Sequence, residues 1–182
     1  MFFYNLIVCT LSVLFWLYIL YALWEMKNHR APFVPSPNAP KKLAFIKISN
    51  LLAGKKINKT VIDAGCGNGS MLAKLAQQHP RHRFIGIEYN KNLYTYCLHR
   101  YKKIPNLTFL HQDLLEYDYN QADIIYYFGF PELTKNLQEK LLNTQKKIDL
   151  IALDATFDKL TLIDKENFRF WLTKSYIYHY KN

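Results

Sequence analysis

The spacing of apolar and polar residues changes several times along the chain, which predicts short strands separated by helices. Strand-like apolar runs are Val61-Ile62, Phe84–Ile87, Leu107–Leu110, Asp123–Phe128 and Ile148–Leu153. Apolar residues recur with helical spacing over Gly69–His79, Lys91–Lys103 and Pro131–Lys147. Strands that alternate with helices of this length predict a parallel sheet covered by helices on both faces.

The C-terminal residues follow a different pattern. Phe168–Leu172 and Ser175–Tyr180 read as two short aromatic strands that pair antiparallel. The sequence therefore predicts an α/β fold with a doubly wound, mostly parallel sheet of about seven strands. Folds of this kind bind ligands at the carboxyl ends of their strands.

The N-terminal segment contains no charged side chain from Phe2 to Trp24. As a helix it would be roughly 35 Å long, which is enough to cross the hydrocarbon core of a membrane. Tyr4, Tyr21 and Trp24 suit the two membrane interfaces. A cleavable signal peptide needs a basic start and small residues at a cleavage site, and neither is present. Residues 1–26 are therefore predicted to form a single transmembrane anchor.

Charge indicates the side of the membrane. Basic residues such as Lys27 and Arg30 follow the apolar segment, whereas only the amino terminus precedes it. The positive-inside tendency then puts the body of the protein on the cytoplasmic side, with the bacterial inner membrane as the preferred location and the mitochondrial inner membrane as the alternative. A net charge of +10 and a pI near 9.4 fit a domain beside anionic lipids. Nucleic acid is not an expected partner, because no run of basic residues is interleaved with aromatic ones.

The segment 27–40 is rich in proline and basic residues, and it predicts a stiff linker. Asn38 can cap a helix over Lys41–Ala53 that has Pro40 in its first turn and ends before Gly54. This helix begins the predicted globular domain, residues 41–182. It is expected to pack beside the loop that follows the first strand.

That loop reads Asp63-Ala64-Gly65-Cys66-Gly67-Asn68-Gly69 and is followed by Ser70. Alternate glycines let the backbone turn tightly and approach a ligand, and the first amides of the next helix then face that ligand. Such a turn alone can be an ordinary strand-to-helix connection. Glu88 and Asp113, which singly could be surface residues, follow the next two strands and place acidic groups at three successive strand ends. The dinucleotide-binding fingerprint is not matched, because its third glycine would have to be residue 70.

The order Asp-x-Gly-x-Gly-x-Gly, with acidic residues after the next two strands, resembles the motifs of the class I S-adenosylmethionine-dependent methyltransferases. The resemblance implies that S-adenosylmethionine is the cofactor. In this family the glycines pass under its methionine part, the first acid orients the amino end, the second holds the ribose and the third holds the adenine amine. The implied cofactor-binding residues are Asp63, Gly65, Gly67, Gly69, Glu88 and Asp113. Cys66 is interpreted as a small filler in the loop.

A narrower resemblance covers nearly the whole chain. The apolar N-terminal segment, the Pro32-Phe33-Val34-Pro35 linker and the Tyr127-Phe128-Gly129-Phe130-Pro131 segment are similar to the small membrane-anchored protein lysine methyltransferases. That family includes the enzymes acting on the adenine nucleotide translocase and on the ATP synthase c subunit. The resemblance implies methyl transfer to a lysine of a membrane-associated protein. The residues expected to face that lysine are Phe128, Phe130, Pro131 and Pro35. Tyr126 and Tyr127 are further candidates, and packing in the sheet core is the alternative for each aromatic residue.

Other functions remain open at this point. A methyltransferase of a lipid or of another small membrane-partitioned molecule would need the same anchor, and a non-enzymatic cofactor-binding or scaffolding protein could have so short a chain. An NAD-dependent oxidoreductase is a more distant alternative. Three cysteines without paired spacing indicate a reducing compartment, and the histidines lack metal-ligand spacing. The sequence does not indicate the oligomeric state.

Overall fold

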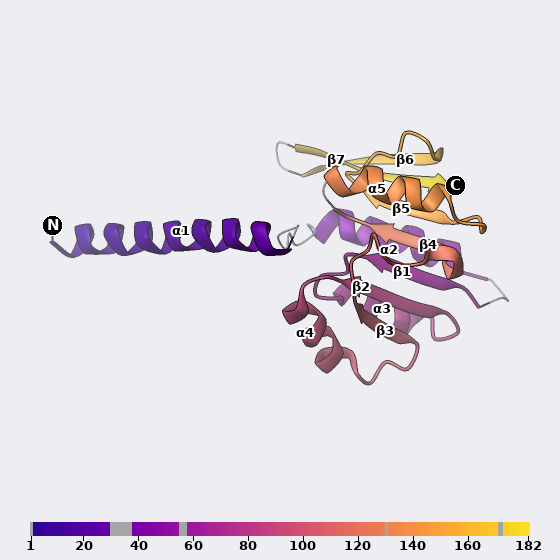
Figure 1. Cartoon of the computed structure of the whole chain (residues 1–182), viewed down its shortest axis with the longest axis horizontal. Helices are drawn as coiled ribbons and strands as arrows, with labels where there is room; N and C mark the ends of the chain where they lie inside the picture. The colour runs from indigo at the N-terminus through magenta and orange to yellow at the C-terminus, as the bar shows by residue number, and fades with distance from the viewer. Residues whose placement is uncertain (1, 30–37, 55–57, 130, 171–172) are drawn as a thin grey trace. The chain divides into compact units, whose positions relative to one another are not determined.

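The structure is a computed structural model that describes the backbone of residues 2–29, 38–54, 58–129, 131–170 and 173–182 (Figure 1). The chain divides into two compact units, Met1–Val34 and Pro35–Asn182. The first unit contains one helix and the second contains the sheet with its covering helices.

Helix α1 (Phe2–His29) is the helix of the first unit. It covers the whole segment predicted to be helical from the apolar residues. Its described side chains are largely exposed, and Trp16 packs edge-to-face on Phe15 with ring centroids 5.9 Å apart. Among the residues that the structure describes, no helix combines the length and the apolar character that a membrane crossing requires. The predicted transmembrane anchor is therefore not supported by the structure, although a helix does form over residues 2–29.

The second unit is built on one sheet of seven strands. Its helices are α2 (Asn38–Leu52), α3 (Ser70–Gln78), α4 (Lys91–Tyr101), the 3₁₀ turn η1 (Tyr119–Gln121) and α5 (Pro131–Leu142). Its strands are β1 (Thr60–Ala64), β2 (Arg83–Glu88), β3 (Leu107–His111), β4 (Ile124–Tyr127), β5 (Asp149–Leu153), β6 (Thr161–Phe170) and β7 (Thr173–Lys181). The spatial order is β3-β2-β1-β4-β5-β7-β6. The first five strands are parallel, and β7 runs antiparallel to both β5 and β6. The predicted seven-stranded α/β fold is confirmed.

The central strands are buried on both faces, as expected for parallel strands covered by helices. Alternate residues of each strand contribute to two cores, so that Ile62 and Ile125 lie on one side and Val61 and Ile124 on the other. The second core includes buried residues of α2, α3 and α4, whereas the first includes buried residues of α5. The domain is thus a sandwich of helices, sheet and helix.

Two element bounds differ most from the prediction, and the other elements differ from it by smaller shifts. Strand β6 begins at Thr161, seven residues before the predicted Phe168, because it is an edge strand whose described side chains are exposed and include the charged Asp164, Lys165 and Glu166. Exposed charges on an edge strand hide the apolar pattern by which strands are recognised. Helix α5 ends at Leu142 rather than Lys147, because the carbonyl of Leu141 accepts from the side chains of Thr144 at 2.7 Å and Asn182 at 2.8 Å.

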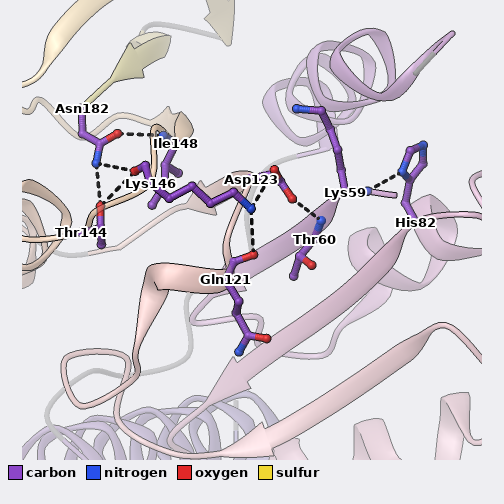
Figure 2. Close-up of polar contacts among 9 residues, drawn as sticks. All are labelled: Lys59, Thr60, His82, Gln121, Asp123, Thr144, Lys146, Ile148 and Asn182. Carbon is purple, nitrogen blue, oxygen red and sulfur yellow. Dashed lines mark hydrogen bonds and ion pairs between the residues drawn. The ribbon is translucent and has the colours of Figure 1, made fainter. Parts of the chain in front are cut away.

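Polar side chains join neighbouring segments at the amino ends of the strands (Figure 2). The Asp123 carboxylate accepts from the Thr60 amide at 2.8 Å and pairs with Lys146 Nζ at 2.9 Å. Asn182 Oδ1 accepts from the Ile148 amide at 2.7 Å. These contacts fasten the amino-terminal edge of the sheet and the C-terminus of the chain. The glycine loop and the acidic residues lie at the opposite, carboxyl edge.

Candidate active site

The glycine loop connects β1 to α3 and is fastened to the end of β2. The amides of Gly65 and Cys66 both donate to the carbonyl of Ile87, at 3.0 and 2.9 Å. Gly65, Gly67 and Gly69 have φ angles of +89°, +56° and +65°, in a region that other L-residues rarely adopt. The backbone of this loop therefore requires glycine at all three positions.

Gly69 has a second, steric reason to be glycine. A Cβ on Gly69 would lie 2.7 Å from Phe109 Cε1 and 3.1 Å from Cys97 Sγ. A Cβ on Gly86 would meet the same ring at 2.7 Å and Cys66 Sγ at 2.8 Å. The loop therefore rests directly on the Phe109 ring and the two thiols. Cys66 is only partly exposed. Its hydrogen bond with Cys97, together with burial, raises the pKa of the Cys66 thiol, which fits the interpretation of Cys66 as a filler.

Glu88 ends β2 and holds the loop and the next helix together. Its carboxylate accepts from the Gly67 amide at 2.7 Å and from the Asn90 amide at 2.8 Å. The side chain is buried, and this burial raises the pKa of the carboxyl, while the Asn90 and Gly67 amides lower it. A carboxylate has about four acceptor positions, so Glu88 can still accept from a diol such as the ribose hydroxyls.

Asp63 lies in β1 with only 3% of its surface exposed. The pKa of its carboxyl is raised to about 7, mainly by burial, with the Lys41 charge lowering it and the Glu88 charge raising it. Lys41 comes from the first turn of α2, and its Nζ donates to Ser70 Oγ at 2.6 Å. A buried carboxyl with a strongly raised pKa in a loop of glycines is typical of a functional site. A cationic partner would stabilise the charged form of the Asp63 carboxyl.

Asp113 follows β3 by two residues. Its Oδ1 accepts from the Leu115 amide at 2.8 Å, and its carbonyl accepts from the Glu116 amide at 3.0 Å. The neighbouring Leu114 lies 3.9 Å from the position of a Cβ on Gly65, so this segment approaches the glycine loop. The carbonyl of Glu88 also accepts from the Gln112 amide at 3.2 Å. The structure therefore brings the ends of β1, β2 and β3 together, as the sequence predicted, because these strands are neighbours in the sheet.

The residues predicted to face the acceptor are less completely described. Tyr126 and Tyr127 are buried on opposite faces of β4 and belong to the two cores, so core packing is the correct interpretation for both. Phe128 is partly buried beside the second core, and Pro131 is exposed at the start of α5. The other two predicted residues, Phe130 and Pro35, lie outside the described residues.

Lys41 and Ser70 are site residues that the sequence did not indicate. The sequence places Lys41 in a helix and next to other basic residues, which gives no sign that its amine reaches the glycine loop. His111 is another such residue, because its Nε2 lies 2.9 Å from the Tyr89 carbonyl and its ring stacks on Tyr94 at 5.4 Å. Residues that meet in space but lie on different elements show no regular spacing in the sequence, so the sequence does not indicate them.

The strand order separates this fold from the dinucleotide-binding one. Nicotinamide-binding sheets continue with a sixth parallel strand, whereas here antiparallel β7 is inserted between β5 and β6. The buried Asp63 carboxyl suits the amino group of a methionine moiety, and the glycines leave room for a ligand close to the backbone. Fold and site together define a class I methyltransferase that uses S-adenosylmethionine.

Comparison with protein families identifies the particular group. The model of the ANTKMT methyltransferase domain matches residues 63–160, more than half of the chain, and the chain belongs to this family. The matched range includes the glycine loop, both later acidic residues and the segment around Phe128. No curated protein sequence matches the chain.

Solved structures share the fold at low sequence identity. An RNA methyltransferase from Salinibacter ruber in complex with S-adenosyl-L-homocysteine is 17% identical with a TM-score of 0.65, over 81% of this chain and 93% of that one. A SAM-dependent methyltransferase from Aquifex aeolicus is 16% identical with a TM-score of 0.57, over 81% and 99%. TYW2 of M. jannaschii in complex with AdoMet is 17% identical with a TM-score of 0.57, over 76% and 75%. These likenesses show the fold alone.

Proposed function

We propose that this methyltransferase transfers methyl groups from S-adenosylmethionine to a lysine side chain of a membrane-associated protein. The observation that carries the proposal is the family match over residues 63–160. Membership of the ANTKMT methyltransferase family agrees with the sequence resemblance to the membrane-anchored protein lysine methyltransferases.

The cofactor side of the proposal rests on the three acidic residues. S-adenosylmethionine supplies a methyl group on a positively charged sulfur, ready for displacement by a nucleophile. Asp63 would orient the amino end, Glu88 would accept from the ribose hydroxyls and Asp113 from the adenine amine. Glu88 and Asp113 are already held by hydrogen bonds within the chain, so these two groups need little rearrangement on binding.

The acceptor side requires a lysine that has lost its proton. An apolar, aromatic environment disfavours the charged ammonium and so lowers the pKa of a substrate lysine. Aromatic rings also attract the methylated, cationic product. The partly buried Phe128 and the exposed Pro131 lie where β4 ends and α5 begins, and we propose that they form one wall of the lysine channel. Phe130 and Pro35 remain predicted members of the same channel.

The membrane part of the proposal rests on α1 and on charge. Its described side chains between Val8 and Tyr21 are mostly apolar and mostly exposed, and Trp16 and Tyr18 each expose more than 60% of their surface. The chain as a whole carries a net charge of +10, which favours an anionic lipid surface. We therefore propose that the enzyme works at a membrane, with the bacterial inner membrane as first choice and the mitochondrial inner membrane as second.

A lipid acceptor is the second candidate function, because an apolar exposed helix serves a lipid methyltransferase equally well. Both candidates are tested by one assay. The purified protein is incubated with S-adenosylmethionine labelled in its methyl group and with membranes of the source organism, after which proteins and lipids are separated. We expect label in a discrete protein band, on a lysine, that is lost in the Glu88→Ala variant. Label confined to the lipid fraction would favour the second candidate, and absence of label despite cofactor binding would contradict both.

A further inference from the structure

The Lys41 side chain of α2 makes direct contact with Ser70, the first residue of α3. Its Nζ donates to Ser70 Oγ at 2.6 Å, across 29 positions of sequence. Its charge also lies close enough to Asp63 for the two groups to shift each other's pKa in opposite directions. The contact joins α2 to the end of the glycine loop.

The partly buried position of Lys41 destabilises its charged ammonium form, and a ligand could remove this destabilisation. The side chain is partly buried, and burial lowers the pKa of its amine, with Asp63 acting against this effect. A lysine that is only needed for solubility would point into water, where its charge is fully hydrated. A negatively charged partner in the site would restore the stability of the ammonium form.

The start of α3 provides a second reason to expect a negative group there. Gly69 is the N-cap of this nine-residue helix and contributes no side-chain cap, and of the first amides that of Ser70 donates to Asn68 Oδ1 at 3.2 Å. The first amides of a helix have no partner within the helix, and they carry the positive end of its dipole. Lys41 and the start of α3 therefore create a positive region directly beside the negative Asp63.

This arrangement of charges matches one part of the cofactor. The methionine part of S-adenosylmethionine carries an ammonium and a carboxylate on the same carbon atom. We propose that Lys41, held in place by Ser70, binds the α-carboxylate of the cofactor while Asp63 binds its α-ammonium. The proposal rests on the cofactor and is independent of whether the methyl acceptor is a lysine or a lipid.

Lys41 would then determine which adenosyl compounds the site prefers. S-adenosylhomocysteine has the same amino-acid end as the cofactor, whereas 5′-methylthioadenosine lacks it altogether. A charge-assisted hydrogen bond to a carboxylate contributes to the first ligand and is absent from the second. The two ligands therefore separate a contact with the carboxylate from a general effect on the shape of the loop.

The test is a calorimetric titration of the full-length protein with each ligand. Lys41→Met should weaken binding of S-adenosylhomocysteine by about 10- to 100-fold and leave 5′-methylthioadenosine unchanged. Lys42→Met, which removes an exposed lysine one position further along α2, should change neither affinity. If Lys41→Met does not fold, Lys41→Gln, which can still donate to Ser70, should show the same selective loss. Equal losses for both ligands, or no loss for S-adenosylhomocysteine, would overturn the proposal.

Discussion

Asp63 is the residue whose charge state bears most directly on cofactor binding. Burial and the nearby Glu88 raise the pKa of its carboxyl to about 7, so that the free protein binds a proton there near neutral pH. An ammonium group beside the carboxylate favours its charged form and lowers that pKa. Binding of the cofactor should therefore release a proton at pH values below about 7.

The expected result is an affinity for S-adenosylhomocysteine that rises with pH up to about 7 and is constant above it. The slope cannot exceed tenfold per pH unit, because one proton is involved. Calorimetric titrations between pH 5.5 and 8.5 measure this dependence. Asp63→Asn should bind more weakly and lose the dependence in the same range. A flat profile for the unmodified protein would contradict the assigned role of Asp63.

A substitution of Gly69 tests, through the free energy of unfolding, how the glycine loop packs on Phe109. Gly69→Ala combines an unfavourable φ of +65° with a Cβ 2.7 Å from Phe109, so it should lower the free energy of unfolding by about 2–4 kcal/mol. Gly54 is a matched control, because its φ is +69° and nothing lies within 4 Å of its added Cβ. Gly54→Ala should cost only about 1 kcal/mol for the backbone. Urea denaturation of both variants gives the difference, and equal costs would show that the loop does not pack on Phe109 as described.

The acidic residues could be predicted from the sequence, whereas Lys41 could not. Asp63, Glu88 and Asp113 follow three apolar runs, and parallel strands bring such positions to one edge of a sheet. Lys41 reaches the site from another element, through a side-chain contact that depends on how α2 packs. For the same reason, only the structure shows whether Tyr126 and Tyr127 pack in the sheet core or line the lysine channel.

At the scale of elements, the start of α4 joins the loop to the sheet. Asn90 is the N-cap of this helix, and its side chain accepts from the amides of Asn92 at 2.9 Å and Leu93 at 3.2 Å. Its own amide donates to Glu88, so the cap and the ribose-binding candidate are adjacent. The orientation of Glu88 therefore depends partly on how this helix begins.

Asn90→Ala should lower the free energy of unfolding by about 1 kcal/mol, which is the usual cost of losing an N-cap. It should also weaken binding of S-adenosylhomocysteine, because the segment that positions Glu88 becomes less ordered. Asn92→Ala is the control, since only the backbone amide of Asn92 takes part in the cap. Denaturation and titration of the two variants are compared, and similar effects of both would contradict the importance of the cap.

Most elements were predictable because their apolar residues repeat with a clear period. Helix α3 is one residue shorter than predicted at each end, and α4 begins at the predicted Lys91 and ends two residues early. Strand β6 was predicted too short because its exposed side chains include Asp164 and Glu166, which both pair with Lys47 of α2. A strand whose exposed side chains are charged and pair with a residue distant in sequence lacks the alternation of apolar and polar residues on which strand prediction depends.

At the scale of the whole molecule, the two compact units suggest that the domain folds without α1. The unit Pro35–Asn182 contains both hydrophobic cores and all the site residues that the structure describes. A chain that starts at residue 35 should therefore bind S-adenosylhomocysteine as tightly as the full chain and show a cooperative thermal transition. Loss of binding or of the transition would show that α1 contributes to the domain. Sedimentation of both chains with lipid vesicles then measures the proposed contribution of α1 to membrane binding.

The most direct test of the account is the crystal structure of the complex with S-adenosylhomocysteine. We expect the ribose hydroxyls to lie within hydrogen-bond distance of Glu88, the adenine amine near Asp113 and the amino-acid end beside Asp63. A ligand bound in the reverse direction, or away from the carboxyl ends of β1, β2 and β3, would contradict it.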